Sequence, residues 1–138
     1  MTRLLLCIML FLTSFEVAAE DEPASLPTSA SMYFELDPAF VLNYGNGGDG
    51  RLKFLRAELT LRLATQGEVI NAVNLHMPAI RHAIIMHLSK QTSQRINDTA
   101  QRETLRVELR DQVRVTLAET GVNEGVEDLL FNAFLVQR

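Results

Sequence analysis

The sequence feature that most constrains the fold is an apolar stripe that follows a proline near the middle of the chain. Ile80, Ile84 and Leu88 recur at four-residue intervals, which is the spacing of one face of an amphipathic helix. Pro78 suits the first turn of this helix, because its missing N–H has no intrahelical partner to lose there. Residues 68–76 are predicted to form a separate helical piece, since proline disfavours helical backbone in the preceding residue. Isolated helices of this length are marginal in water, so we predict that the apolar face packs on a sheet.

The composition indicates one globular domain with additional sequence in front of it. The chain has 138 residues, of which 47% are hydrophobic and 22% are charged, so it can bury a core. Its formal net charge of -4 argues against nucleic acid as a partner, because binding phosphates requires clustered positive charge.

Residues 1–19 have the pattern of a secretory signal peptide. An apolar run from Leu4 to Leu12 follows a single positive charge, and small residues end the segment at Ala19. The run is well short of the roughly 20 apolar residues that a spanning helix needs, so we expect export and cleavage after Ala19. The alternative is that the segment is retained as a short membrane anchor. With cleavage the mature chain loses Cys7 and cannot form a disulfide.

The next part of the chain changes from linker to domain. Residues 20–32 are acidic and then rich in Pro, Ser and Ala, which predicts a flexible linker. Residues 33–138 form the predicted domain. Its first segment, residues 33–43, is β-prone but contains Pro38, which predicts an edge strand or a strand in two parts. Residues 44–50 contain four glycines and are predicted to form a hairpin loop.

Residues 55–63 are predicted to be the second strand. Leucine and alanine alternate there with polar and charged residues, so one face would be buried and the other wet. The leucines at 52, 55, 59 and 63 would also suit a helix, but glycines on both sides favour a strand. We expect this strand to pair antiparallel with residues 33–43.

The last part of the chain predicts a helix and a final strand. Asp98 or Thr99 is a plausible N-cap, and Gly121 is predicted to end the helix. Residues 122–138 place apolar side chains on both faces, so we predict a strand that is covered on both sides. The apolar helix positions are Leu105, Leu109, Val113 and Leu117.

Together these elements predict an α+β fold. It would contain a small antiparallel or mixed sheet, made of two N-terminal strands plus the C-terminal strand, covered by two to three helices.

A row of arginines lies beside the apolar positions of this last helix and repeats at the same spacing. One interpretation is a solvated face with ion pairs to Glu103, Glu108 and Asp111. The other is a contact with an acidic protein partner, which could be a second copy of this chain, because arginine forks suit interface carboxylates. The candidate contact residues are Arg102, Arg106, Arg110 and Arg114.

Catalytic chemistry is not predicted. His76, His82 and His87 are six and five residues apart, so no two of them form the i, i+4 pair that binds zinc on one helical face. No serine stands in a Gly-x-Ser-x-Gly elbow, and the one cysteine lies in the leader. We therefore expect no enzyme, no cofactor, no metal and no catalytic residue.

Four groups of residues, in the same order, resemble the FliL family of flagellar basal-body proteins. The resemblance spans residues 33–138 and ends in a Phe-x-x-Phe-x-Val-Gln terminus. The groups are Tyr33, Leu36, Pro38, Phe40, Val41 and Asn43; Arg51-Leu52-Lys53-Phe54-Leu55; His76-Met77-Pro78-Ala79-Ile80-Arg81 with Leu88-Ser89; and Val126 with Leu130-Phe131, Phe134 and Val136-Gln137.

The resemblance implies a non-catalytic protein that supports the flagellar motor. FliL-like proteins lie on the periplasmic side of the cytoplasmic (inner) membrane, with a domain that resembles the stomatin/prohibitin (SPFH) core. The implied partners are stator proteins of the MotA/MotB type and further copies of the chain, in a homo-oligomer such as a ring. The implied role is in flagellar rotation, swimming or swarming motility and chemotaxis. The family has one spanning helix after a cytoplasmic stub, whereas this chain begins with a short signal-like segment.

A second class of function is suggested without the resemblance. A leader followed by a small α+β domain also suits a periplasmic binding module for an anionic or envelope ligand, with the arginine row as its surface. Such a module should have a concave pocket with a few convergent polar groups, whereas a scaffold should have a flat or stripe-like surface.

Overall fold

The computed structural model of the chain describes residues 30–45, 53–65 and 67–137. The predicted leader, most of the predicted linker and most of the glycine-rich loop lie outside these residues. The elements in chain order are β1 (Ser31–Glu35), β2 (Phe40–Asn43), β3 (Phe54–Ala64), α1 (Gly67–Leu75), α2 (Met77–Ser89), α3 (Ser93–Asn97), α4 (Thr99–Ala118) and β4 (Val126–Gln137). The α+β class and the small antiparallel sheet are confirmed.

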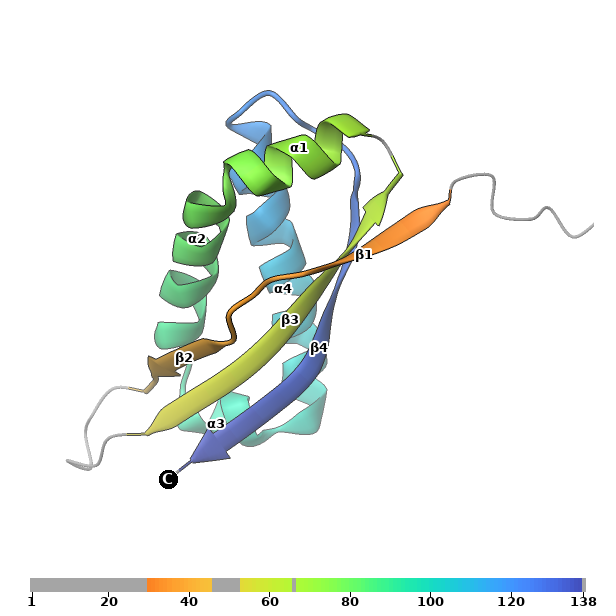
Figure 1. Cartoon of the computed structure of the whole chain (residues 1–138). Helices are drawn as coiled ribbons and strands as arrows, with labels where there is room; N and C mark the ends of the chain where they lie inside the picture. Colours follow the sequence, from red (N-terminus) through yellow and green to blue (C-terminus); the bar gives the residue numbers. More distant parts are fainter. Residues whose placement is uncertain (1–29, 46–52, 66, 138) are drawn as a thin grey trace, which may run out of the picture.

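Strand β3 is the centre of the sheet. Strand β4 pairs with it along one edge, from Phe54 opposite Gln137 to Leu63 opposite Val126. Strands β1 and β2 follow one another along the other edge, and every pair is antiparallel (Figure 1). The break between β1 and β2 contains Pro38, so the predicted two-part strand is confirmed. β1 begins at Ser31, two residues before the predicted start of the strand.

The helices form one layer against one face of the sheet (Figure 1). The predicted stripe of α2 faces this sheet, and Ile80, Ile84 and Leu88 are each 0% exposed. The break before Pro78 is also confirmed, because α1 ends at Leu75 and α2 begins at Met77. Burial of these large aliphatic side chains stabilises the helix layer by roughly 1.5–3 kcal/mol each.

Helix α4 begins and ends as its sequence predicts. The Asp98 carboxylate accepts hydrogen bonds from the N–H groups of Ala100 and Gln101, at 2.8 and 3.4 Å, so Asp98 is the N-cap. The helix ends at Ala118, and Gly121 follows with a φ of 94°, in the left-handed region that glycine adopts without strain.

A carboxylate on α4 connects this helix to α2 and α3. Glu108 accepts a hydrogen bond from Arg95 of α3 at 2.5 Å and lies 3.0 Å from Nε2 of His87 on α2. The pKa of Glu108 is lowered, first by the hydrogen bond from Arg95 and then by the contact with His87, which outweigh its partial burial. His87 thus has a packing role between helices.

Two expectations about the fold differ from the structure. The prediction that the C-terminal strand is covered on both faces is wrong: β4 is an edge strand, and Leu135, which lies opposite Arg56, is 60% exposed. Alternate residues of a strand point to opposite faces, and the helices of residues 67–118 lie on one face of this sheet (Figure 1). The sequence does not predict helix α3, because its five residues bury only Ile96 and show no periodicity.

None of the helices in the described part of the chain has the length and apolar character that crossing a membrane requires. Residues 30–45, 53–65 and 67–137 also contain no group of three or more His, Cys, Asp or Glu side chains that could hold a metal ion.

Candidate interaction site: the arginine row of α4 and the edge of β4

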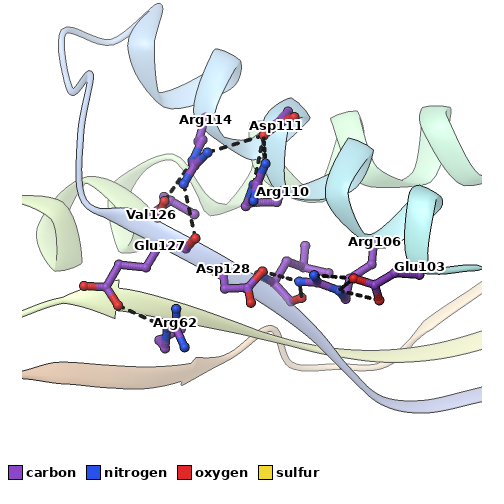
Figure 2. Close-up of polar contacts among 10 residues, drawn as sticks. Arg62, Glu103, Arg106, Arg110, Asp111, Arg114, Val126, Glu127 and Asp128 are labelled. Atoms are coloured by element: carbon purple, nitrogen blue, oxygen red, sulfur yellow. Dashed lines mark hydrogen bonds and ion pairs between the residues drawn. The ribbon is translucent and has the colours of Figure 1, made fainter.

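The four arginines of α4 share one side of the helix because they are spaced four residues apart. The chain reverses between Ala118 and Val126, so β4 runs back along the sheet beside this side of α4. Figure 2 shows that Arg106 and Arg114 point at the first residues of β4. We call Arg102, Arg106, Arg110 and Arg114 together the arginine row.

Arg106 makes the densest contacts of the row (Figure 2). Its Nη1 atom donates to the carboxylate of Asp128 and, at 2.9 Å, to the backbone carbonyl of Leu129. Its Nε and Nη2 atoms donate to Glu103 at 2.9 and 2.6 Å. The side chain is only 19% exposed, so Arg106 is a packed link between α4 and β4.

These contacts shift the titration of all three side chains. The pKa of Arg106 is raised above its ordinary value, first by hydrogen bonding to Glu103 and then by Asp128. The pKa of Glu103 is lowered, first by the hydrogen bond from Arg106. Partial burial acts to raise the pKa of Asp128, but hydrogen bonds from the Leu129 N–H and from Arg106 outweigh it and lower this pKa. All three groups are therefore charged at neutral pH.

Arg114 contacts the backbone at the start of β4. Its Nε atom donates to the carbonyl of Val126 at 2.8 Å, and its Nη2 atom donates to the carbonyl of Glu127 at 3.1 Å. The ladder shifts register here, since Arg62 lies opposite Asp128 and Leu63 opposite Val126, which leaves Glu127 as an extra residue. Arg114 thus binds the carbonyls of a bulge at the sheet's edge.

The other two arginines are bound differently. The guanidinium of Arg102 lies 5.4 Å from the centre of the Phe134 ring on β4, which is within the range of a cation–π contact. Arg110 pairs with the neighbouring Asp111 at 2.9 Å. Three of the four arginines therefore contact β4. Within the described residues, Arg110 makes no such contact.

The sequence identifies the row but not its targets. Both interpretations place it on an exposed face, and Arg114 is 42% exposed, but the side chains of Arg106 and Arg110 are only 19% and 23% exposed. Sequence reasoning missed Asp128 and Glu127; Glu127 also accepts from Ser31 at 2.7 Å and pairs with Arg62 at 3.1 Å. A signal was present, because these two acidic residues interrupt the apolar start of the last strand. A contact between the row and a protein partner stays a prediction.

The structure predicts unequal roles for neighbouring arginines. Arg106→Met should lower the free energy of unfolding by about 2–3 kcal/mol, because it leaves Asp128 partly buried without its guanidinium. Arg110→Met is the matched control and should stay within about 0.5 kcal/mol of the parent, since it removes only a pair with Asp111, whose side chain is 50% exposed and stays in contact with water. Urea unfolding of both chains measures the difference; equal losses would show that the contact with β4 adds nothing.

A cavity of about 360 Å³ lies at the turn between α4 and β4, beside Arg114. Glu124 and Glu127 line it as well, and the Arg114 guanidinium is already bound to backbone carbonyls. The Glu127 carboxylate is paired with Arg62, and the one guanidinium in this lining already binds backbone carbonyls, so this cavity gives no support to an anionic-ligand site.

Comparison with known proteins identifies the family. Residues 33–137 match the family described as "Flagellar basal body-associated protein FliL". The chain is also 30% identical over 115 residues to the "Flagellar protein FliL" of Aquifex aeolicus (strain VF5), over 83% of this chain and 67% of that protein. The family match begins in β1 and ends with the last residue of β4, so it includes every helix described above. This chain belongs to the FliL family of flagellar basal body-associated proteins.

Proposed function

We propose that this protein is a non-catalytic support of the flagellar motor, on the periplasmic side of the cytoplasmic membrane. There it contacts stator proteins of the MotA/MotB type and further copies of itself, and so supports swimming or swarming motility and chemotaxis. The observation that carries the proposal is the family match, which covers the folded domain from residue 33 to residue 137.

The exposed arginine of the row is Arg114, and the Arg110 side chain one turn before it is 23% exposed. Arg114 is 42% exposed and Val115 beside it is 54% exposed, so a cationic and an apolar side chain are accessible together. Arginine is enriched in protein interfaces, where its planar fork pairs with carboxylates. Arg110 precedes them by one helical turn and has an exposed partner, Asp111. We propose that Arg110 and Arg114 meet the acidic partner, whereas Arg106 holds the fold.

The test is motility of cells in which the chromosomal gene carries Arg110→Glu. Charge reversal should weaken the partner contact, because like charges facing an acidic surface repel and interface charges set register and partner choice. The cells should still build filaments but swim or swarm poorly in viscous medium, and less stator protein should co-purify with the variant. Support of an existing motor is thereby separated from filament assembly.

The matched control is Lys90→Glu, which reverses an exposed charge at the end of α2, away from the arginine row. It should leave motility and co-purification at the parent level. If the Arg110→Glu cells swim normally under load and retain stator protein, the row does not contact the partner. If deletion of the whole gene leaves motility under load unchanged, the motor-support proposal itself is wrong.

A further inference from the structure

The two edges of the sheet are protected very differently. On the β4 edge, Arg106 and Arg114 donate hydrogen bonds to backbone carbonyls, from Val126 to Leu129. On the other edge, β3 is the one described element against which β1 packs extensively. An uncovered edge strand presents unpaired N–H and C=O groups to any chain that can pair with them.

The register shows which groups of β1 face outward. The N–H of Leu36 donates to Leu59 at 2.9 Å, and Thr65 donates to the carbonyl of Ala30 at 3.0 Å, so the even-numbered residues bond with β3. Bonding alternates along an antiparallel strand, so the backbone groups of residues 31, 33 and 35 point to the open edge. Within the described residues, no bond outside the strand ladders uses these groups.

We propose that a second copy of the chain adds its own β1 along this edge, antiparallel, with the two-fold axis through Tyr33. In this register Tyr33 faces the Tyr33 of the second copy, and Ser31 faces Glu35. Each of the three residue pairs exchanges two backbone hydrogen bonds, about six in all. Helices of both copies then lie on the same side of one continuous sheet.

The side chains of β1 suit pairing with a second copy. Tyr33 is 62% exposed on the helix-free face of the sheet, where two facing rings remove apolar surface from water. Glu35 faces Ser31, whose hydroxyl donates to Glu127 of its own copy, so no two charged side chains stand directly opposite each other. The contact uses the same residues on both copies, which makes it a closed, two-fold interface.

The arginines hinder further growth of this sheet. A dimer joined at β1 leaves the backbone groups of β2 and the two β4 edges open, and Arg106 and Arg114 bind the carbonyls of Val126, Glu127 and Leu129 at the start of each β4. A further strand would have to displace these bonds to pair with the first part of β4. The contact at β1 stands whether or not the chain acts at the motor; a second contact at Arg110 and Arg114 would allow dimers to assemble further.

Disulfide trapping in the purified full-length chain tests the register. Ser31→Cys and Glu35→Cys are made separately in a Cys7→Ser background and then mixed under mild oxidation. Facing residues of a bonded pair lie about 5.5 Å apart between Cα atoms, which suits a disulfide. The mixture should give a cross-linked dimer. Either variant alone should not, because identical positions then lie about 13 Å apart, four residues along the strand.

Two outcomes would overturn the proposal. In the first, the mixture of the two variants forms no cross-link and the parent chain sediments as a monomer. A second copy then does not bind the β1 edge. The other outcome is equal cross-linking of Ser31→Cys alone, which shows that contact is not in the stated register.

Two further variants test the edges by sedimentation. Tyr33→Lys places like charges opposite each other at the two-fold axis and should raise the dimer dissociation constant at least about tenfold, with the thermal transition retained. The double variant Arg106→Ala, Arg114→Ala frees the β4 carbonyls and should produce species larger than a dimer. Should the double variant keep the parent's size while folded, the arginines do not protect the edge.

Discussion

A chain that ends at Leu130 is expected to show no cooperative unfolding transition. Removing residues 131–138 takes away the half of β4 that pairs with Phe54 to Leu59, and it removes Phe131 and Phe134, which pack against the core. The helix-facing residues of this part of β3 are buried and would then lose their neighbours on one side. The lost burial is roughly 1.5–3 kcal/mol for each large side chain, against a typical domain stability of about 5–15 kcal/mol. The remaining chain should therefore be unfolded.

The matched control removes only residues 137 and 138. Gln137 is exposed and pairs with Phe54 at the end of the ladder, so its loss should cost no more than about 1 kcal/mol. Circular dichroism during heating distinguishes the two chains. A truncated chain that ends at Leu130 and melts near the parent temperature would show that the second half of β4 is dispensable.

Gly125→Ala is expected to destabilise the domain strongly, although it adds only one methyl group. Gly125 has a φ of 110°, which L-residues with a side chain rarely adopt. A Cβ at this position would lie 2.2 Å from Cγ2 of Val69, a side chain that is 1% exposed on α1. Backbone strain and overpacking each cost about 1–3 kcal/mol, so we expect a loss of about 2–6 kcal/mol in the free energy of unfolding.

Gly121→Ala separates strain from overpacking. Its φ is also positive, at 94°, but no atom lies within 4 Å of an added Cβ, so only the strain of about 1–2 kcal/mol should appear. Combining Gly125→Ala with Val69→Ala should cost at least about 1 kcal/mol less than the sum of the two single losses, because the smaller side chain makes room. Additive losses in urea unfolding would contradict the contact with Val69.

Most of the fold follows from local patterns in the sequence. The four-residue spacing of Ile80, Ile84 and Leu88 predicts α2 and its buried face, and the alternation of residues 55–63 predicts β3. Pro38 predicts the break between β1 and β2, and Asp98 predicts the start of α4. These predictions succeed because each one depends on residues that are close together in the sequence. The spacing of apolar residues shows which face of a helix or strand meets the core, and a proline or a capping residue marks where the element ends.

The position of a strand within the sheet is not encoded in this way. The apolar residues on both faces of β4 indicate burial on both sides, yet the described helices cover only one face of the sheet. A residue such as Leu135 is left exposed because coverage depends on how many elements the whole chain supplies. Apolar character does not prove burial, because the rule that buried residues are apolar holds in one direction only.

The targets of the arginine row also depend on tertiary structure. Periodicity shows that Arg106 and Arg114 share a side of α4, but not what lies opposite them. In space, eight helical residues advance about 12 Å, and the three steps from Val126 to Leu129 advance about 10 Å along the strand. The two elements run antiparallel after the turn, so Arg114 meets the start of β4 and Arg106 meets Leu129. The length of the turn between Ala118 and Val126 sets which residue of β4 lies opposite each arginine.

The placement of β1 and β4 on opposite edges of β3 has a mechanical consequence. Ser31 lies opposite Ala64 and Gln137 lies opposite Phe54, so the described chain enters at one end of β3 and leaves at the other. β3 has 11 residues, about 35 Å of strand. Tension between these two ends would act along the strands and across their hydrogen bonds, which are perpendicular to it, so many bonds would share the force in shear. Resistance to such a pull depends on the barrier to unfolding, and this sheet presents that barrier along the line between Ser31 and Gln137.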